Sequence, residues 1–106
     1  MEIYYHMSAG CLSQYIETQK IRKHLLETMF LCEIKEGNFQ RKTPFVDITL
    51  LNVRNAESWS DNDYDAHKTN YISIIIEESD RENSAIISLF RALEKICGWA
   101  VIKDLG

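Results

Sequence analysis

The segment that most constrains the fold of this chain is residues 71–78, with the sequence Tyr-Ile-Ser-Ile-Ile-Ile-Glu-Glu. Its apolar side chains alternate at Ile72, Ile74 and Ile76, which is the period of two expected for a β-strand. Ile75 adds an apolar side chain to the opposite face, as is typical of a strand covered on both sides. We therefore predict a central strand at residues 71–78, with neighbouring strands on both sides.

Three other segments have strand patterns. Apolar residues alternate at Ile3, Tyr5 and Met7, which predicts a first strand. Residues 45–53 alternate in the same way and predict a second strand. Residues 99–102 are apolar and are predicted to form the closing strand of the chain.

Two segments have the spacing of amphipathic helices. Apolar residues recur along residues 12–30 with polar residues between them, which predicts a helix of about four or five turns. The second helix is predicted to follow residues 79–82, which have the form of a capping box. Its apolar stripe covers residues 86–96, and Gly98 supplies the conformation that ends a helix.

The predicted order is therefore β-α-β-β-α-β, which indicates an α+β fold. Two strand-helix-strand units in so short a chain favour a ferredoxin-like sandwich, in which an antiparallel sheet carries both helices on one face. In that architecture the first strand and residues 71–78 form the central pair. The alternative is a longer antiparallel meander with an extra hairpin around Gly37-Asn38. Either arrangement treats residues 1–106 as a single domain.

Charge and cysteine content argue against some classes of partner and compartment. The chain has 12 Lys and Arg against 16 Asp and Glu, and its net charge of −4 argues against nucleic acid, because phosphate binding needs clustered basic residues. No apolar run approaches the roughly 20 residues of a membrane helix, so no membrane partner is predicted. Three cysteines without a Cys-x-x-Cys pair, and a start without a secretory pattern, favour the cytoplasm.

Residues 54–70 separate the two middle strands by an unusually long connection. Connections longer than about 12–15 residues are uncommon in compact domains and are usually functional or disordered. Residues 57–82 hold eight acidic side chains and two basic ones, with aromatic residues among them. Aromatic side chains anchor protein interfaces and charges steer association, so this region is a candidate for binding a basic protein. The predicted partner-binding residues are Trp59, Asp61, Asp63, Tyr64, Asp65 and Glu78.

The favoured function is therefore a small acidic protein-binding module. By analogy with toxin-immunity and anti-defence proteins, we expect an inhibitor of a basic partner such as a toxin or a nuclease. The same loop has a second interpretation of equal weight, as a solvated hairpin loop whose Trp59 folds back on the core.

An alternative function uses the face of the sheet that the helices leave open. Its residues are predicted to be Tyr4, His6, Thr49, Leu51, Tyr71, Ser73 and Ile75. A contiguous exposed apolar patch of this kind marks an interface. The alternative is therefore a homodimeric ligand-binding or catalytic domain that acts through Tyr4, His6 and Tyr71.

No motif in the sequence indicates a cofactor or a reaction. A Gly-rich phosphate loop, a Gly-x-Ser-x-Gly elbow and a His-Glu-x-x-His pair are all missing. We predict neither a cofactor nor a metal, and no catalytic residue is assigned. An enzyme is thus the less favoured class, because catalysis has to be argued from a site.

Overall fold

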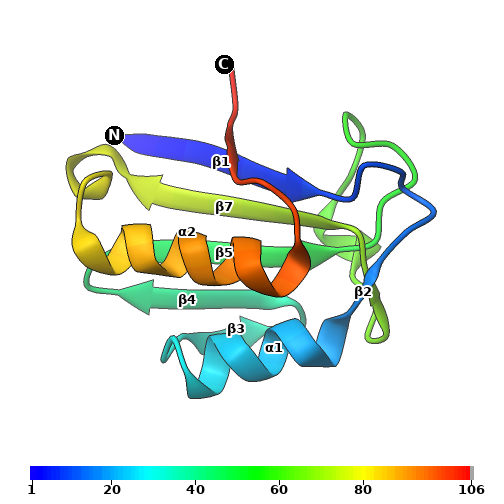
Figure 1. Ribbon diagram of the computed structural model, residues 1–106, viewed down its shortest axis with the longest axis horizontal. Coiled ribbons are helices and arrows are strands. Elements are labelled where there is room, and N and C mark those ends of the chain that lie inside the picture. Colours follow the sequence, from blue (N-terminus) through cyan, green and yellow to red (C-terminus); the bar gives the residue numbers. More distant parts are fainter. Residues whose placement is uncertain (106) are drawn as a thin grey trace.

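Strand β7 (Tyr71–Glu77) lies inside a six-stranded antiparallel sheet with the strand order β3-β4-β5-β7-β1-β8 (Figure 1). The structure is a computed structural model and describes residues 1–105. The other strands of this sheet are β1 (Glu2–Ser8), β3 (Cys32–Lys35), β4 (Asn38–Lys42), β5 (Phe45–Leu51) and β8 (Ile102–Lys103). The α+β class and the antiparallel sheet predicted from the sequence are confirmed.

The predicted central pair is confirmed by the register of β1 and β7. The two strands pair along their whole length, from Glu2 opposite Glu77 to Ser8 opposite Tyr71. The hairpin around Gly37-Asn38 is also present, because β3 and β4 pair on either side of that turn. The sheet therefore combines the predicted central pair with the extra hairpin of the alternative arrangement.

Two helices, α1 (Thr18–Glu27) and α2 (Ser84–Cys97), cover the same face of the sheet (Figure 1). The prediction of a helix over residues 12–30 was too long at both ends. Before α1, the chain makes a short strand β2 (Ile16–Glu17) that pairs with β6 (Lys68–Thr69). That pairing joins segments about 50 residues apart, and a periodicity argument on residues 12–30 alone cannot detect it.

The start of α2 also differs from the prediction. The predicted capping box at residues 79–82 is wrong, because Glu78–Asp80 form a short 3₁₀ turn, η2. Asn83 caps the helix instead: its side-chain oxygen accepts a hydrogen bond from the Ala85 amide at 2.8 Å. The predicted end of the helix is confirmed, since Gly98 adopts a left-handed φ of 74°.

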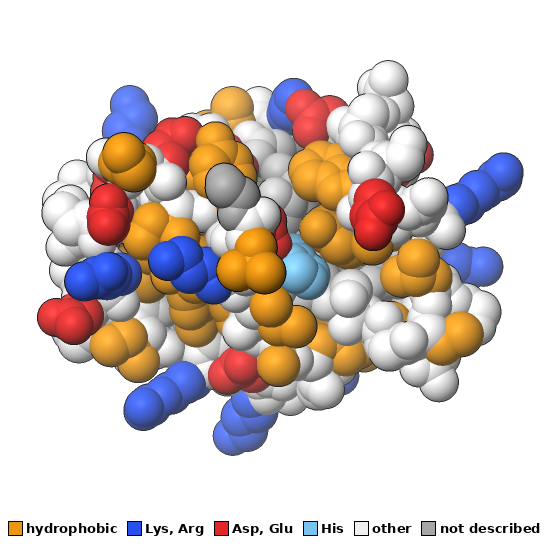
Figure 2. All heavy atoms as spheres, turned by 90° about the horizontal axis from the view of Figure 1, so that it is seen from above, with side chains coloured by type: hydrophobic (Ala, Val, Ile, Leu, Met, Phe, Trp, Pro, Cys, Tyr) orange, Lys and Arg blue, Asp and Glu red, His pale blue; other side chains and the backbone are white. Residues whose placement is uncertain are grey.

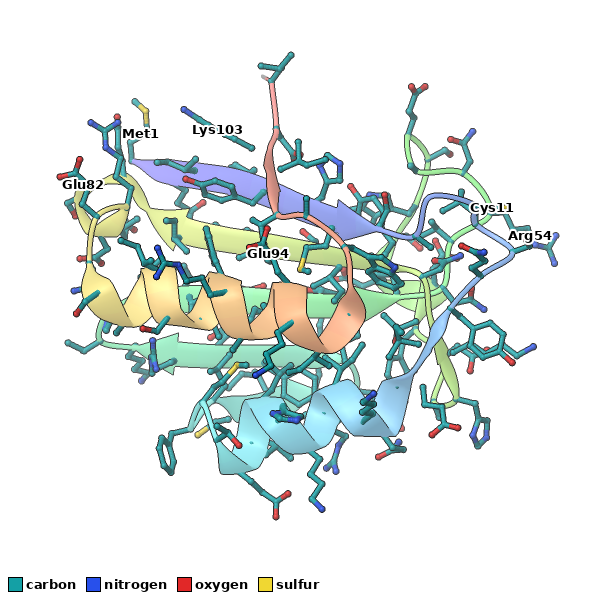
Figure 3. All side chains as sticks on the ribbon, in the orientation of Figure 1. Met1, Cys11, Arg54, Glu82, Glu94 and Lys103 are labelled. Carbon is teal, nitrogen blue, oxygen red and sulfur yellow. The ribbon has the colours of Figure 1, made fainter. Side chains whose placement is uncertain are left out.

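The closing strand begins later than predicted, at Ile102 rather than at residue 99. The amide of Val101 donates a hydrogen bond to the Glu94 carboxylate at 2.9 Å and is therefore not free to pair with a strand. Glu94 projects from α2 toward this segment (Figure 3). The helix thus sets the point at which the chain can join the sheet.

The main hydrophobic core lies between the helices and the sheet. Its fully buried large side chains include Ile21 and Leu25 of α1, Ile86 and Leu93 of α2, and the alternating residues Met7, Phe39, Ile48, Leu50, Ile72, Ile74 and Ile76 of the strands. The alternation predicted for residues 71–78 is therefore the core face of β7. A second, smaller cluster lies on the opposite face around Leu51, Val53 and Tyr71.

The three cysteines are expected to differ in reactivity. Cys97 is buried, and burial raises its pKa to about 11, so little thiolate forms near pH 8. Cys11 and Cys32 are exposed, and a hydrogen bond with Ser13 lowers the pKa of Cys11. We expect a disulfide reagent at pH 8 to modify two thiols quickly and the third only after denaturation. Three equally fast thiols would contradict this placement of Cys97.

Candidate functional site

The open face of the sheet carries the side chains that alternate with the core residues. The register places Tyr4 opposite Ile75 and His6 opposite Ser73, and it places Leu51 opposite Tyr71. Thr49 also faces Ser73. The set of open-face residues predicted from the sequence therefore shares one face, as expected from a period of two.

One end of this face is covered by the chain itself. The connection between β5 and β7, residues 52–70, folds over it, and Trp59 packs against Leu51, Val53 and Tyr71. The Trp59 and Tyr71 ring centroids lie 5.7 Å apart. Trp59 is half-buried, in agreement with the interpretation that it folds back on the protein. Part of its surface still faces outward.

His6 is held in place from two sides. Its Nδ1 is hydrogen-bonded to the Asp104 carboxylate, and its ring is parallel to that of Tyr71, with the centroids 5.6 Å apart. Burial raises the pKa of Tyr71 above its ordinary value, so this phenol stays neutral. Asp104 was not predicted as a site residue. Its only sequence signal is its position two residues after Ile102 in the closing strand.

Three hollows lie along the open face and its β1/β8 edge, with volumes of about 830, 500 and 470 Å³. The largest, named here the His6 groove, is lined by residues that include His6, Glu57, Trp59, Tyr71, Ile102 and Asp104. Trp59 also lines the smallest of the three. Figure 2 looks onto the β1/β8 edge, where hydrophobic side chains surround a histidine.

The charge of these three hollows is predominantly negative. Their carboxylates belong to Glu2, Asp47, Glu57, Asp61, Glu78 and Asp104. Their lysines are Lys35 and Lys103, and the N-terminal amine and His6 are also in the lining. The open face therefore combines partly exposed aromatic rings with an excess of negative charge.

The acidic residues of the connection mostly have partners within the chain. Asp61 forms an ion pair with Lys35 of β3 at 2.8 Å. Asp63 accepts a hydrogen bond from the Ser60 amide at 2.9 Å and closes a capping box around the 3₁₀ turn η1 (Asp61–Asp63). These contacts fold the connection, so its carboxylates are less available to steer a partner than the sequence alone indicates.

Tyr64 and Asp65 also hold the connection in place. The Tyr64 ring lies against Gly37, and burial together with the charges of Glu33 and Glu36 raises its pKa. Asp65 accepts hydrogen bonds from the amides of His67 at 2.7 Å and Lys68 at 3.0 Å. Asp63, Tyr64 and Asp65 line a separate hollow together with Asn52 and Arg54. The structure thus separates these three from Trp59 and Asp61 on the open face.

Glu78 lies at the other end of the sheet from the connection. It follows the seven residues of β7, a distance of about 20 Å, and its amide donates to the carbonyl of Met1 at 2.8 Å. In Figure 3, Met1 and Glu82 mark this end and Arg54 marks the opposite one. The prediction that Glu78 and the connection form one acidic region is therefore wrong. Glu78 lines a hollow with Tyr4 instead.

No family model, no curated protein and no solved structure matches this chain. Within residues 1–105, no helix has both the length and the apolar character needed to cross a membrane. In the same range, no group of three or more His, Cys, Asp or Glu side chains is placed to hold a metal ion. Function therefore has to be argued from the geometry of the open face.

The backbone amides that bind Asp65 make stability depend on pH. They lower its pKa below the ordinary value of 3.8, so the stabilisation is present above that value and is lost as the pH falls through the lower, folded pKa. Asp65→Asn retains an acceptor but cannot titrate. We expect the variant to lose less stability than the wild type between about pH 5 and pH 2, as measured by urea unfolding. An unchanged acid profile would contradict this assignment.

Proposed function

We propose that this protein is a binding module that recognises a basic protein through the open face of its sheet. The observation that carries the proposal is the lining of the three hollows, where six carboxylates and two lysines surround partly exposed aromatic residues. Aromatic side chains supply contact area at interfaces, and complementary charge steers the partner and fixes its register. The net charge of −4 acts in the same direction.

Exposed apolar side chains favour a protein as the ligand. Tyr4 is 48% exposed and Ile102 is 51% exposed, and both are at the β1/β8 edge. Exposed apolar side chains surrounded by polar groups are a feature of protein interaction surfaces. A nucleic acid is disfavoured at the same place, because carboxylates repel phosphates.

An inhibitory role is consistent with this chemistry. A nuclease or a toxin that acts on nucleic acid carries a basic surface for phosphates, and an acidic face with aromatic anchors can cover such a surface. In this proposal the recognition surface is the sheet face rather than the connection alone. Trp59 and Asp61 stay in it, whereas Asp63, Tyr64 and Asp65 act mainly by folding the connection.

The order of the strands supports a finer fold proposal. The four neighbours β5-β7-β1-β8, with α1 following β1 and α2 following β7, have the split βαβ order of a ferredoxin-like sandwich. The hairpin β3-β4 then extends the sheet beyond β5. This extension widens the open face and brings Lys35 to its ion pair with Asp61.

The test compares three forms of the protein in affinity capture from its native host lysate. Trp59→Ala removes the central aromatic side chain of the open face. Phe30→Ala is the matched control, because Phe30 is 75% exposed and lines none of the three hollows. We expect wild type and Phe30→Ala to capture the same basic protein and Trp59→Ala to lose it.

Calorimetry with the captured protein then measures the effect. We expect Trp59→Ala to weaken binding at least tenfold, the loss typical of an aromatic anchor, and Phe30→Ala to change it less than twofold. We also expect affinity to fall as salt increases, because the surfaces are oppositely charged. A partner that is acidic, or that binds Trp59→Ala as tightly as the wild type, overturns the proposal.

A second candidate is a homodimeric domain with a ligand-binding or catalytic site around His6. The observation in its favour is the hydrogen bond between His6 and Asp104, because a carboxylate that holds one ring nitrogen orients the other for proton transfer. Sedimentation velocity separates the two candidates. A tight dimer that Tyr4→Lys dissociates favours the second, and a monomer favours the first.

A further inference from the structure

We propose that the His6 groove is a receptor for one arginine side chain of the basic partner. This inference rests on the proposed function, since it names the chemical group that the open face recognises. It is carried by the combination of aromatic rings and carboxylate oxygens that have no partner in residues 1–105, all around one groove of about 830 Å³. A guanidinium is the protein cation that uses both kinds of group, because it is planar and carries several donors.

The aromatic wall of the groove is formed by Trp59. Its neighbour Tyr71 is buried on the same open face of the sheet, and the two ring centroids lie 5.7 Å apart. Trp59 is only half-buried, so part of its indole faces the groove. Tryptophan is the strongest partner for a cation placed over an aromatic ring, and arginine is the side chain most often found there.

The carboxylates of the groove come from two separate segments. Asp104 follows β8, and its Oδ1 is bound to His6, which leaves Oδ2 without a protein partner in residues 1–105. Glu57 belongs to the connection, and its carboxylate makes no hydrogen bond or ion pair within that range. Both acceptors are therefore available to the forked donors of a guanidinium.

Lys103 is the positive side chain that would oppose a cation in this groove. It lines the groove, but it pairs with Tyr5, whose side chain packs into the helix-side core, so within β8 its side chain leaves from the face opposite to that of Ile102. Figure 3 shows its side chain directed toward Met1 and away from the end marked by Arg54. The lysine charge is thus turned away from the Trp59 wall.

The experiment uses small probes in place of the partner. Acetyl-arginine-methylamide is titrated at low salt into the protein and followed by NMR at the Trp59 indole N–H. The chain has two tryptophans, and Trp99→Phe identifies the Trp59 signal. The citrulline analogue is the matched probe, because it retains the shape of arginine without the charge. We expect millimolar binding of the arginine probe and at least tenfold weaker binding of citrulline.

Variants then test the carboxylates. Glu57→Gln should weaken arginine binding at least threefold without a change in stability, because the Glu57 carboxylate has no partner in the described chain to lose. Asp104→Asn should weaken it as well. Glu36→Gln is the control, since Glu36 is exposed and lines none of the three hollows. Glu36→Gln should bind like the wild type.

The outcomes separate this inference from the proposed function. If the arginine probe leaves the Trp59 signal unmoved, or if citrulline binds equally well, the arginine receptor is overturned. Capture of a basic protein through Trp59 would then still support the proposed function. Conversely, arginine binding that Glu57→Gln weakens supports the receptor even when lysate capture fails. If the protein captured from the lysate is acidic, the proposed function is overturned, whereas the arginine receptor is still decided by the probe titrations.

Discussion

Replacing Asn70 with alanine is expected to lower the free energy of unfolding by about 3–5 kcal/mol. Asn70 is completely buried, and its amide nitrogen donates to the carbonyls of Leu12 and Val53, each at 2.9 Å. Its side-chain oxygen accepts from the Val53 amide at 2.8 Å. Alanine leaves these three backbone groups without their hydrogen-bond partner. Each of them that water does not reach lowers the free energy of unfolding by about 1–3 kcal/mol. Chemical denaturation followed by circular dichroism measures the loss.

The same substitution is expected to loosen the candidate site. Val53 is at the beginning of the connection that carries Trp59, and Leu12 is in the segment between β1 and β2. Asn70 joins both to the start of β7, so its loss should raise amide exchange in residues 52–70 more than in the core strands. Asn62→Ala is the control, since Asn62 is exposed on the same connection. A loss below 1 kcal/mol for Asn70→Ala would show that its hydrogen bonds are not structural.

The strands and their shared faces were predictable because alternation is a local property. Ile72, Ile74 and Ile76 on one face imply Tyr71, Ser73 and Ile75 on the other, whatever the neighbouring strands are. A period of two therefore identified both the core and the open face before any contact was known. Gly98 was predictable for the same reason, since a left-handed residue at a helix end favours glycine.

Features that depend on distant contacts were not predictable in this way. Thr18 begins α1, and its hydroxyl donates a hydrogen bond to the Asp65 carbonyl at 2.7 Å. Asp65 lies 47 positions further along the chain. Periodicity extended the predicted helix back to residue 12 because apolar residues there have helical spacing. In the structure the helix begins only at Thr18, and Ile16 and Glu17 before it pair with β6 instead. Asn70 was missed because a single buried amide leaves no pattern in a sequence.

The candidate site was predicted in part for related reasons. Tyr4, His6 and Tyr71 come from strands, so their common face followed from alternation. Asp104 was missed because the closing strand was placed three residues too early, at residue 99 instead of 102. Glu78 was placed at the far end of the strand that follows the loop and was grouped with the loop on charge alone, although a strand of seven residues keeps the two apart. Charge counts along a sequence say nothing of which end of a strand a residue occupies.

The second large effect is expected from Gly37→Ala, which should lower the free energy of unfolding by about 2–4 kcal/mol. Gly37 has a φ of 79°, a left-handed conformation that costs other residues about 1–2 kcal/mol. An added Cβ would also lie 2.3 Å from Cδ1 of Tyr64. The turn cannot shift freely, because its carbonyl accepts from the Leu50 amide at 2.8 Å. The Tyr64 ring therefore has to move.

Gly98→Ala is a matched control, because it isolates the backbone contribution. Gly98 has a similar φ of 74°, but an added Cβ there meets no atom within 4 Å. We expect Gly98→Ala to lower the free energy of unfolding by about 1 kcal/mol. The loss for Gly37→Ala should be larger, because its added Cβ also clashes with the Tyr64 ring. If urea unfolding shows equal losses of stability for Gly37→Ala and Gly98→Ala, the Tyr64 ring does not lie on Gly37.

A double-mutant cycle then measures how firmly the connection is seated on the hairpin. In a Tyr64→Ala background, Gly37→Ala should cost only the backbone penalty, so the two substitutions should couple by about 1–2 kcal/mol. Tyr64 is between Asp61, which is paired with Lys35, and Asp65, which caps the next turn. Displacing its ring should therefore disturb Trp59 as well. A partner that binds through Trp59 should then bind Gly37→Ala more weakly, although Gly37 lies outside the hollows of the open face.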